Sequence, residues 1–393
     1  MKKIFGIVSL YYNSKNYGGL LQSYAMVKAV EKLGYEAQQV CLQLNTSIKD
    51  AAFELYAQDG KGMSLLVFAI RKFREKFFAR FKRRNISDLL KVRYNKFKQF
   101  ECSIPHSENV YNKGNVKEAC EIYDGFICGS DQIWNVGYTK LYVYALEFVD
   151  HKKKKISYAA SAGGNDKSTR FLEQIRSDAE EIDFISVREK SAIELFDGET
   201  KNRIEVVLDP TLLVTAEEWM TVAAQSIVKK PYVFCYLLGL DKEVRNTVKI
   251  ISKMKGLELV TLPYVLGKYT SCDEEFGDTQ LFDVGPREFL TLIKNAELVL
   301  TDSFHACAFS LQFEKEFFVF ERRSVGTEKS MHNRIADFLD LFGLTDRLIS
   351  EKNAKEVIDN SKNIDFSFPK KVLNVERKKS LDFLHRALSG EEN

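Results

Sequence analysis

Short apolar runs alternate with amphipathic segments along most of the chain, and this pattern is typical of parallel β-strands connected by helices. In the first half, the expected strands are 3–10, 37–41, 122–128, 155–160, 184–187 and 205–208. In the second half, they are 232–238, 257–262, 298–300 and 317–320. The expected helices are 20–33, a segment from 242 onwards, 286–295, a segment after His305, 333–342 and 371–388. The pattern predicts an α/β protein.

A polar stretch at 215–230 separates the two series of strands. A chain of 393 residues that is 45% hydrophobic is long enough for two cores. We therefore predict two Rossmann-like domains that face a cleft, an N-terminal domain at 1–215 and a C-terminal domain at 216–355. A helical segment at 356–393 follows. Ligands of such sheets gather at the carboxyl ends of the strands, so the site is expected in the cleft.

Residues 45–100 interrupt the alternation with a basic sequence of helical pattern, which we interpret as an insertion on the first domain. Its part 71–98 interleaves basic residues with Phe73, Phe77, Phe78 and Phe81. This composition suits a helix that contacts an anionic membrane surface. The favoured alternative is a solvated helical hairpin that packs its phenylalanines on the first domain.

Charge, cysteines and hydropathy narrow the class of protein. The net charge is +3, from 58 basic and 55 acidic residues, which argues against a general nucleic-acid binder. The seven cysteines form no C-x-x-C pair, so we expect reduced thiols in a cytoplasmic protein and no metal site. The apolar run at 1–12 lacks a cleavage site and the run at 65–70 is short, so we expect no signal peptide and no membrane span.

The strongest local signal for function is the junction T-D-S-F-H, where an apolar strand runs directly into a helix. It places Thr301, Asp302, Ser303 and His305 at the carboxyl end of a strand and the amino terminus of a helix. Unpaired amides and the helix dipole attract phosphate or carboxylate there, and His305 adds a proton donor or a cationic contact. The alternative is that Ser303 only caps the helix and His305 is a satisfied polar side chain.

A second polar strand end follows I-Y-D-G-F-I-C, in the segment G-S-D-Q-I-W-N. Gly129 permits a sharp exit from the strand, and Ser130, Asp131 and Gln132 then present polar groups that suit an acceptor hydroxyl. Asp131 is the obvious carboxylate base in this segment. The alternative is a structural Asx-type turn with Trp134 packed in the core.

Two weaker signals complete the candidate site. Arg188 comes just beyond the strand I-S-V, where a guanidinium suits bidentate binding of phosphate or carboxylate, although most arginines lie on solvated faces. Asn16 and Gly18 belong to N-Y-G-G, a glycine turn before the first helix. This turn lacks the spacing of a dinucleotide-binding loop, so its alternative is a plain loop-to-helix junction.

Six segments, taken in order, resemble the polysaccharide pyruvyl transferase family. The resemblance runs from about residue 3 to about residue 347 and includes N-R-I at 333–335. Its segments are N-Y-G-G-L-L-Q-S-Y-A, D-G-F-I-C-G-S-D-Q-I-W-N, K-I-S-Y-A-A-S-A-G, I-S-V-R-E-K-S, V-L-D-P-T-L-L and L-V-L-T-D-S-F-H-A-C-A-F-S.

The resemblance implies a GT-B-like glycosyltransferase architecture, with phosphoenolpyruvate bound mainly by the second domain and a saccharide or lipid-linked glycan acceptor bound by the first. Family members use an arginine after a late strand of the first domain, which Arg188 matches. They also use an arginine and a histidine in the second domain, and His305 matches the histidine. Ser303 stands where the arginine is expected. N-Y-G-G likewise replaces the N-x-G-D of some members.

The cations that follow the strand 317–320 are candidates to take the place of that arginine: Arg322, Arg323, Lys329, His332 and Arg334. The resemblance thus implies a transferase that forms a pyruvyl ketal on a bacterial cell-surface polysaccharide, such as a capsule or exopolysaccharide, or on its precursor. The expected catalytic residues are His305 as acid or phosphate ligand, Asp131 as base and Arg188 as anion ligand. No cofactor is expected beyond phosphoenolpyruvate as donor. The alternatives are a nucleotide-sugar glycosyltransferase and a non-catalytic glycan-binding relative.

Overall fold

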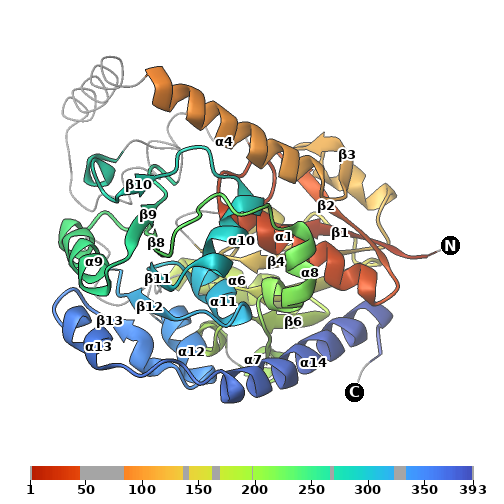
Figure 1. The fold of residues 1–393 in the computed structure, drawn as a ribbon. Coiled ribbons are helices and arrows are strands. Elements are labelled where there is room, and N and C mark those ends of the chain that lie inside the picture. Colours follow the sequence, from red (N-terminus) through yellow and green to blue (C-terminus); the bar gives the residue numbers. More distant parts are fainter. Residues whose placement is uncertain are drawn as a thin grey trace.

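Two separate parallel β-sheets with flanking helices make up the protein (Figure 1). The computed structural model describes residues 2–44, 84–135, 141–161, 169–196, 198–265, 270–322 and 333–391. All strand pairs within these residues are parallel. The prediction of two Rossmann-like α/β domains is confirmed.

The first sheet has the order β3-β2-β1-β4-β5-β6-β7. Its strands are β1 (Ile4–Val8), β2 (Glu36–Leu42), β3 (His106–Tyr111), β4 (Gly125–Asp131), β5 (Lys154–Ala160), β6 (Phe184–Val187) and β7 (Glu205–Val206). The chain starts at β1 in the middle, builds outward to β3, and returns to pair β4 with the other side of β1. The order therefore reverses between β1 and β4, which is where open parallel sheets bind ligands.

The second sheet repeats this plan in the order β10-β9-β8-β11-β12-β13. Its strands are β8 (Tyr232–Tyr236), β9 (Glu258–Thr261), β10 (Thr279–Gln280), β11 (Leu298–Thr301), β12 (Phe317–Phe320) and β13 (Leu348–Ile349). Here the order reverses between β8 and β11. The two reversal points are the natural places for a shared site.

The sequence did not predict the outer strands β3, β10 and β13. The strand β3 has the polar sequence H-S-E-N-V-Y, and β10 and β13 have two residues each. A strand at a sheet edge pairs with only one neighbouring strand and is less enclosed by the core, so its hydrophobic pattern is weak.

The α-helices lie between and around the strands. They are α1 (Tyr17–Lys32), α4 (Arg84–Cys102), α5 (Leu141–Tyr144), α6 (Thr169–Glu180), α7 (Gly198–Arg203), α8 (Ala216–Val222), α9 (Lys242–Lys255), α10 (Pro286–Asn295), α11 (Phe304–Gln312), α12 (Asn333–Leu341), α13 (Ala354–Asn360) and α14 (Ser367–Ser389). Short 3₁₀ helices are η1 (Val116–Glu121), η2 (Lys190–Leu195), η3 (Pro210–Leu212), η4 (Ser271–Asp273) and η5 (Thr345–Arg347).

Helix α1 begins earlier than the sequence predicted. Asn16 is its N-cap, and the Asn16 side chain accepts a hydrogen bond from the amide of Gly19. Gly18 and Gly19 are therefore in the first turn of the helix, and not in a loop that ends at Gly19. An asparagine cap satisfies an otherwise unpaired amide, which compensates for the weak helix propensity of two glycines.

Helices α1 and α4 join the two sheets into one body. The ring of Tyr17 stacks on Phe289 of α10 at 4.7 Å, and its hydroxyl donates to the carbonyl of Val284. On α4, the buried Arg93 donates to the carbonyls of Pro263 and Leu281 in the second half of the chain. The described part of the predicted insertion thus contacts the second domain as well as the first. Residues 45–83, with the four phenylalanines, lie outside the described residues.

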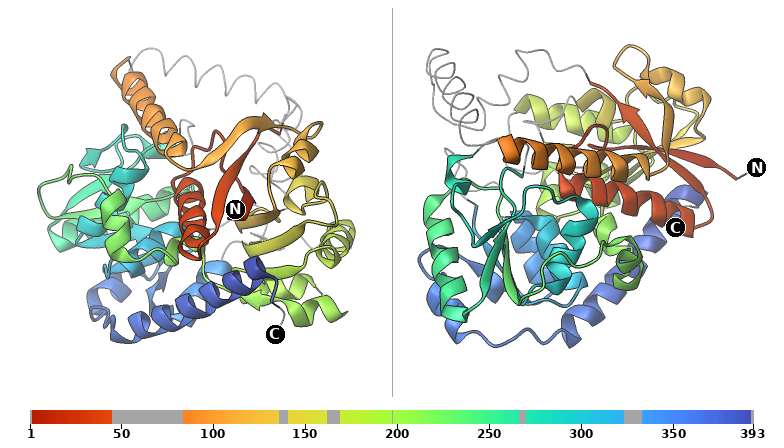
Figure 2. Two further views of the ribbon diagram at one scale, coloured as in Figure 1. Left: turned by 90° about the vertical axis from the view of Figure 1, so that its right-hand side faces the viewer. Right: turned by 45° about the horizontal axis from the view of Figure 1, so that its top comes forward.

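Helix α14 connects the second half of the chain back to the first sheet (Figure 2). The Ser380 hydroxyl accepts a hydrogen bond from the amide of Leu208, directly after β7. Arg386 forms an ion pair with Glu205 of β7 at 2.7 Å. These contacts fix the chain that carries the site residues after β7.

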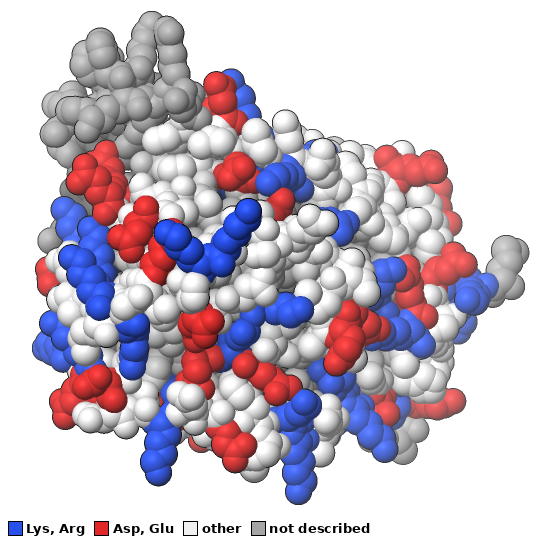
Figure 3. Space-filling model, viewed as in Figure 1, with Lys and Arg blue, Asp and Glu red and all other residues white. Residues whose placement is uncertain are grey.

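The distribution of surface charge and the state of the cysteines agree with what the sequence predicts. Basic and acidic side chains are interspersed over the face shown in Figure 3. All seven cysteines are free thiols. Within the described residues, no helix is both long and apolar enough to span a bilayer, and no group of three potential metal ligands occurs.

Candidate active site

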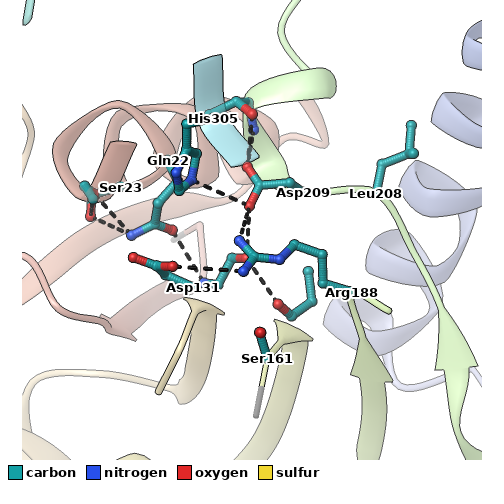
Figure 4. Close-up of polar contacts among 12 residues, drawn as sticks. Gln22, Ser23, Asp131, Ser161, Arg188, Leu208, Asp209 and His305 are labelled. Carbon is teal, nitrogen blue, oxygen red and sulfur yellow. Dashed lines mark hydrogen bonds and ion pairs between the residues drawn. The ribbon is translucent and has the colours of Figure 1, made fainter. Parts of the chain in front are cut away.

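The carboxylate of Asp209 is the centre of a polar cluster formed by both sheets (Figure 4). Asp209 follows β7, and its side chain is fully buried. Its Oδ2 atom accepts a hydrogen bond from Arg188 Nη1 at 2.8 Å, and Nε2 of His305 lies 3.7 Å from the same oxygen. A residue after β6 and a residue of α11 thus meet at one carboxylate.

Further hydrogen bonds hold Asp209 in place. Its Oδ1 atom accepts from the amide of Thr211 at 3.0 Å and from the Thr211 hydroxyl at 2.7 Å. The hydroxyl of Ser130 lies 3.1 Å from Oδ2. Burial alone would raise the pKa of Asp209, but the electrostatic interactions with His305, which is charged only at low pH, and with Arg188, together with these hydrogen bonds, outweigh burial and lower it. Asp209 is therefore ionised at neutral pH.

The guanidinium of Arg188 is buried among three carboxylates. Besides Asp209, these are Asp131 at 3.7 Å and Glu189 at 3.6 Å, and the ring of Phe304 covers one face at 4.3 Å. Burial would lower the pKa of Arg188, but the three negative charges raise it. Its Nε and Nη2 atoms have no hydrogen-bond partner within the described residues, so donors remain for a ligand.

His305 lies in the first turn of α11 and is 7% exposed. Its Nε2 atom has no hydrogen-bond partner among the described residues. Burial lowers the pKa of His305, and the negative charges of Asp209 and Asp131 oppose this only in part. The imidazole is therefore neutral in the free protein at neutral pH, and a bound anion would favour its protonation.

The end of β4 adopts an unusual backbone. Gly129 has φ 113°, and a Cβ atom there would lie 2.2 Å from the carbonyl oxygen of Tyr158, so only glycine fits. Asp131 has φ 69°, and its carboxylate faces Arg188. The amide of Ser130 donates to Gln22 of α1 at 3.2 Å. This local geometry aims the Asp131 carboxylate toward the cluster.

Two further arginines approach from the second domain. Arg334 of α12 is 7% exposed and contacts the side-chain amide of Gln132. Arg322 follows β12, and its Cγ atom would lie 3.4 Å from a Cβ atom on Gly239. The Nε atoms of both arginines lack hydrogen-bond partners within the described residues. Of the other cations named from the sequence, Arg323, Lys329 and His332 lie outside those residues.

Of four further predicted binding residues, three use their side chains in structural hydrogen bonds. Thr301 donates to the carbonyl of Tyr236 at 2.6 Å, and Asp302 accepts from the amides of Leu238 and Gly239 at 2.7 Å each. Ser303 is the N-cap of α11, but its side chain makes no capping hydrogen bond. The side chain of Asn16 caps α1. Ligand binding by these four residues stays a prediction.

The structure brings together the predicted residues Arg188, Asp131, Ser130 and His305, but it centres them on Asp209, which the sequence analysis did not select. The signal was available, because Asp209 begins D-P-T at the end of an apolar strand. Glu189 and Gln22 were also missed. Their own neighbours along the chain do not distinguish them from other polar residues.

The fold is similar to solved structures of UDP-GlcNAc 2-epimerases. The enzyme from Methanocaldococcus jannaschii in complex with UDP-GlcNAc and UDP has a TM-score of 0.51 at 14% identity, covering 97% of this chain and 99% of that chain. A putative epimerase from Listeria monocytogenes has a TM-score of 0.52 at 13% identity, covering 100% and 98%. The protein thus has the GT-B-type fold.

The family model for polysaccharide pyruvyl transferases matches residues 16–324, and the chain belongs to this family. The matched segment includes Arg188, Asp209 and His305. No curated protein gives a significant sequence match. The resemblance seen in the sequence is therefore confirmed at the level of the family.

Proposed function

We propose that the protein transfers the pyruvyl group of phosphoenolpyruvate to two hydroxyls of a sugar, forming a ketal. The observation that supports this proposal is the meeting of Arg188 and His305 at Asp209. These positions match the family's arginine and histidine. Each has buried nitrogen atoms without a hydrogen-bond partner in the described residues. The anionic groups of phosphoenolpyruvate would supply hydrogen-bond acceptors for these atoms.

The reaction requires one proton to be added and two to be removed. Protonation of the donor methylene creates an oxocarbenium-like carbon, which the first acceptor hydroxyl attacks as it loses its proton. The bond to the phosphate oxygen then breaks, and the second hydroxyl closes the ketal and loses its proton. One acceptor proton thus balances the new methyl group, and the other leaves with phosphate or solvent.

His305 and Asp131 are suited to the proton transfers. His305 is neutral in the free protein, and we propose that it becomes protonated beside the bound anion and then serves as acid or phosphate ligand. Asp131 would accept the proton of the acceptor hydroxyl. Arg188 would neutralise an anionic group of the donor. The proposed acceptor is a sugar of a cell-surface polysaccharide or of its lipid-linked precursor.

A nucleotide-sugar glycosyltransferase is the second candidate. It is favoured by the fold shared with an epimerase solved with UDP-GlcNAc and UDP. A non-catalytic glycan-binding relative is the third, and Ser303 in place of the family's arginine favours it. Only the first candidate requires phosphoenolpyruvate as ligand and releases inorganic phosphate.

The test is the melting temperature of the purified protein with phosphoenolpyruvate or UDP-GlcNAc, followed by phosphate release with candidate sugars. A ligand that binds only the folded state raises the melting temperature. We expect a rise with phosphoenolpyruvate that is lost in Arg188→Gln and His305→Ala and kept in the control His385→Ala, an exposed histidine of α14. A rise with UDP-GlcNAc alone would favour the glycosyltransferase.

A further inference from the structure

Arg334 is a buried cation with no carboxylate partner among the residues that the structure describes. It is 7% exposed, its Nε atom has no hydrogen-bond partner, and it forms no ion pair within the described residues. Its guanidinium contacts a neutral group, the amide of Gln132. Buried charges normally have a partner of opposite charge, because desolvation costs several kcal/mol per ion. Arg334 therefore lacks an anionic partner within the described residues.

Of the other buried arginines of the described residues, three have a carboxylate partner, and the fourth, Arg93, donates to the backbone carbonyls of Pro263, Tyr264 and Leu281. Arg188 pairs with Asp209 at 2.8 Å, Arg245 pairs with Asp273 at 2.8 Å, and Arg347 contacts Glu316 at 3.3 Å. Their cost of burial is offset by a carboxylate. Within the described residues, Arg334 has neither a carboxylate partner nor a backbone carbonyl acceptor.

A second arginine that forms no ion pair with a described residue lies in the same region. Arg322 follows β12, beside the loop after β8, and its Nε atom is buried without a partner in the described part of the chain. Burial, together with the positive charges of Arg188 and Arg322, lowers the pKa of Arg334 to about 10. The negative charges of Asp131 and Glu189 oppose this only in part, and of these three arginines only Arg188 forms ion pairs within the described residues.

Helix α12 places Arg334 at the junction of the two domains. The carboxylate of Asp337, one turn further along α12, accepts a hydrogen bond from the amide of Ser191 at 3.1 Å. Ser191 belongs to η2 of the first domain, just after Arg188. Gln132, which Arg334 contacts, follows β4 of the same domain. Arg334 thus lies where both domains contribute to the site.

We propose that Arg334 and Arg322 bind the phosphate group of the donor. Two guanidinium groups that form no ion pair in the described part of the chain match the charge of a phosphate dianion, and their forked donors match its oxygens. Arg188 already has three carboxylates around it, so it suits the donor's single carboxylate better than the dianion. This inference rests on the proposed function, and it orients the donor: phosphate toward α12, and the reacting carbon toward His305 and Asp131.

The experiment separates the two halves of the donor. Inorganic phosphate and pyruvate are each titrated by calorimetry into the wild type, Arg334→Gln, Arg322→Gln and the control Arg245→Gln. We expect Arg334→Gln and Arg322→Gln each to weaken phosphate binding about tenfold or more, because hydrogen bonds between charged groups are lost. The affinity of both variants for pyruvate should stay within about twofold of the wild-type affinity.

The control distinguishes binding from folding. Arg245→Gln leaves Asp273 buried without its ion pair, so it should lower the melting temperature and leave phosphate binding unchanged. Arg334→Gln removes an unpaired buried charge, so it should leave the melting temperature of the free protein unchanged or raise it. A fall in melting temperature as large as that of Arg245→Gln would contradict the absence of a counter-ion.

Three results would overturn the phosphate site: wild-type affinity for phosphate in both variants, no phosphate binding by the wild type at tens of millimolar, or a loss confined to pyruvate. The proposed function fails separately. If the variants lose phosphate binding but the wild type never turns over phosphoenolpyruvate, the anion site stands and the donor is a different phosphate compound. If Arg334→Gln turns over phosphoenolpyruvate with unchanged kcat and KM, the function stands and this inference is wrong.

Discussion

Gly18 of α1 and His305 of α11 are in such close contact that a Cβ atom on Gly18 would lie 2.1 Å from Nδ1 of the imidazole. The two residues come from opposite domains. The absence of a side chain at position 18 is thus what allows His305 to reach Asp209. Gly18, which the sequence analysis placed in the candidate site, thus has a steric role in the structure.

Gly18→Ala should displace His305 and abolish most of the turnover. The new methyl group cannot be accommodated without moving the ring, and overpacking of this kind costs about 1–3 kcal/mol of stability. Gly19→Ala is the matched control, because a Cβ atom there meets nothing closer than the Ser14 hydroxyl at 3.3 Å. Steady-state kinetics and urea denaturation of both variants measure the effects. Equal turnover in the two variants would show that catalysis does not depend on the position of His305.

Asp209→Asn should lower both stability and activity. It removes the ion pair with Arg188, and breaking a buried pair costs about 3–5 kcal/mol, less here because Asp131 and Glu189 also face Arg188. It also removes a negative charge that raises the pKa of His305, so this pKa should fall further.

The control for Asp209→Asn is Asp273→Asn, which breaks the buried pair with Arg245 in the second domain. Both variants should lose stability in urea, but only Asp209→Asn should change the titration of His305 observed by NMR. A titration shift of the same size in Asp273→Asn would contradict a local effect of Asp209.

The stability of the free protein should fall as the pH is lowered below about 6.5, the ordinary histidine value. Burial holds the pKa of His305 below 6.5 in the folded state. Between these two pKa values the unfolded chain binds a proton that the folded protein does not, so stability falls by up to about 1.4 kcal/mol per pH unit. Above pH 6.5 the histidine is neutral in both the folded and the unfolded chain, so the free energy of unfolding no longer depends on its titration.

Urea denaturation of the wild type and His305→Asn at several pH values between 5 and 8 measures this dependence. The difference in the free energy of unfolding between the two proteins should vary with pH below 6.5 and be constant above it. A difference that is constant over the whole range would mean that His305 titrates at its ordinary value.

Arg377→Ala should destabilise the junction of α14 with the segment between the sheets. Its Nε atom donates to the carbonyl of Leu212 at 2.6 Å, and Nη2 donates to Gln312 of α11 at 3.1 Å. Because hydrogen bonds from a charged group are lost, the free energy of unfolding should fall by about 1.5–3 kcal/mol. Lys378→Ala, at an exposed neighbouring position, should change stability by less than about 0.5 kcal/mol. Thermal denaturation compares them, and phosphoenolpyruvate binding should be unchanged in both.

Much of the fold could be predicted because strand and helix periods are local. The strands 184–187 and 317–320 and the helix 286–295 were predicted with the bounds that the structure has. Their apolar positions repeat within a few residues, whatever the rest of the chain does. The edge strands β3, β10 and β13 were missed because they form by pairing with a neighbour already in place, and their own sequence carries little pattern.

The sequence by itself determined two parallel sheets, the polar strand ends and the candidate residues Arg188, Asp131 and His305, since each of these depends on residues close together in the chain. Only the tertiary structure decided that Asp209 joins them and that Arg334 is buried with no ion pair to any described residue. Asp209 and His305 are far apart in sequence, and they meet because both sheets present their carboxyl ends to the same region. Proximity of this kind comes from the order of the strands and the packing of the domains, which no local pattern specifies.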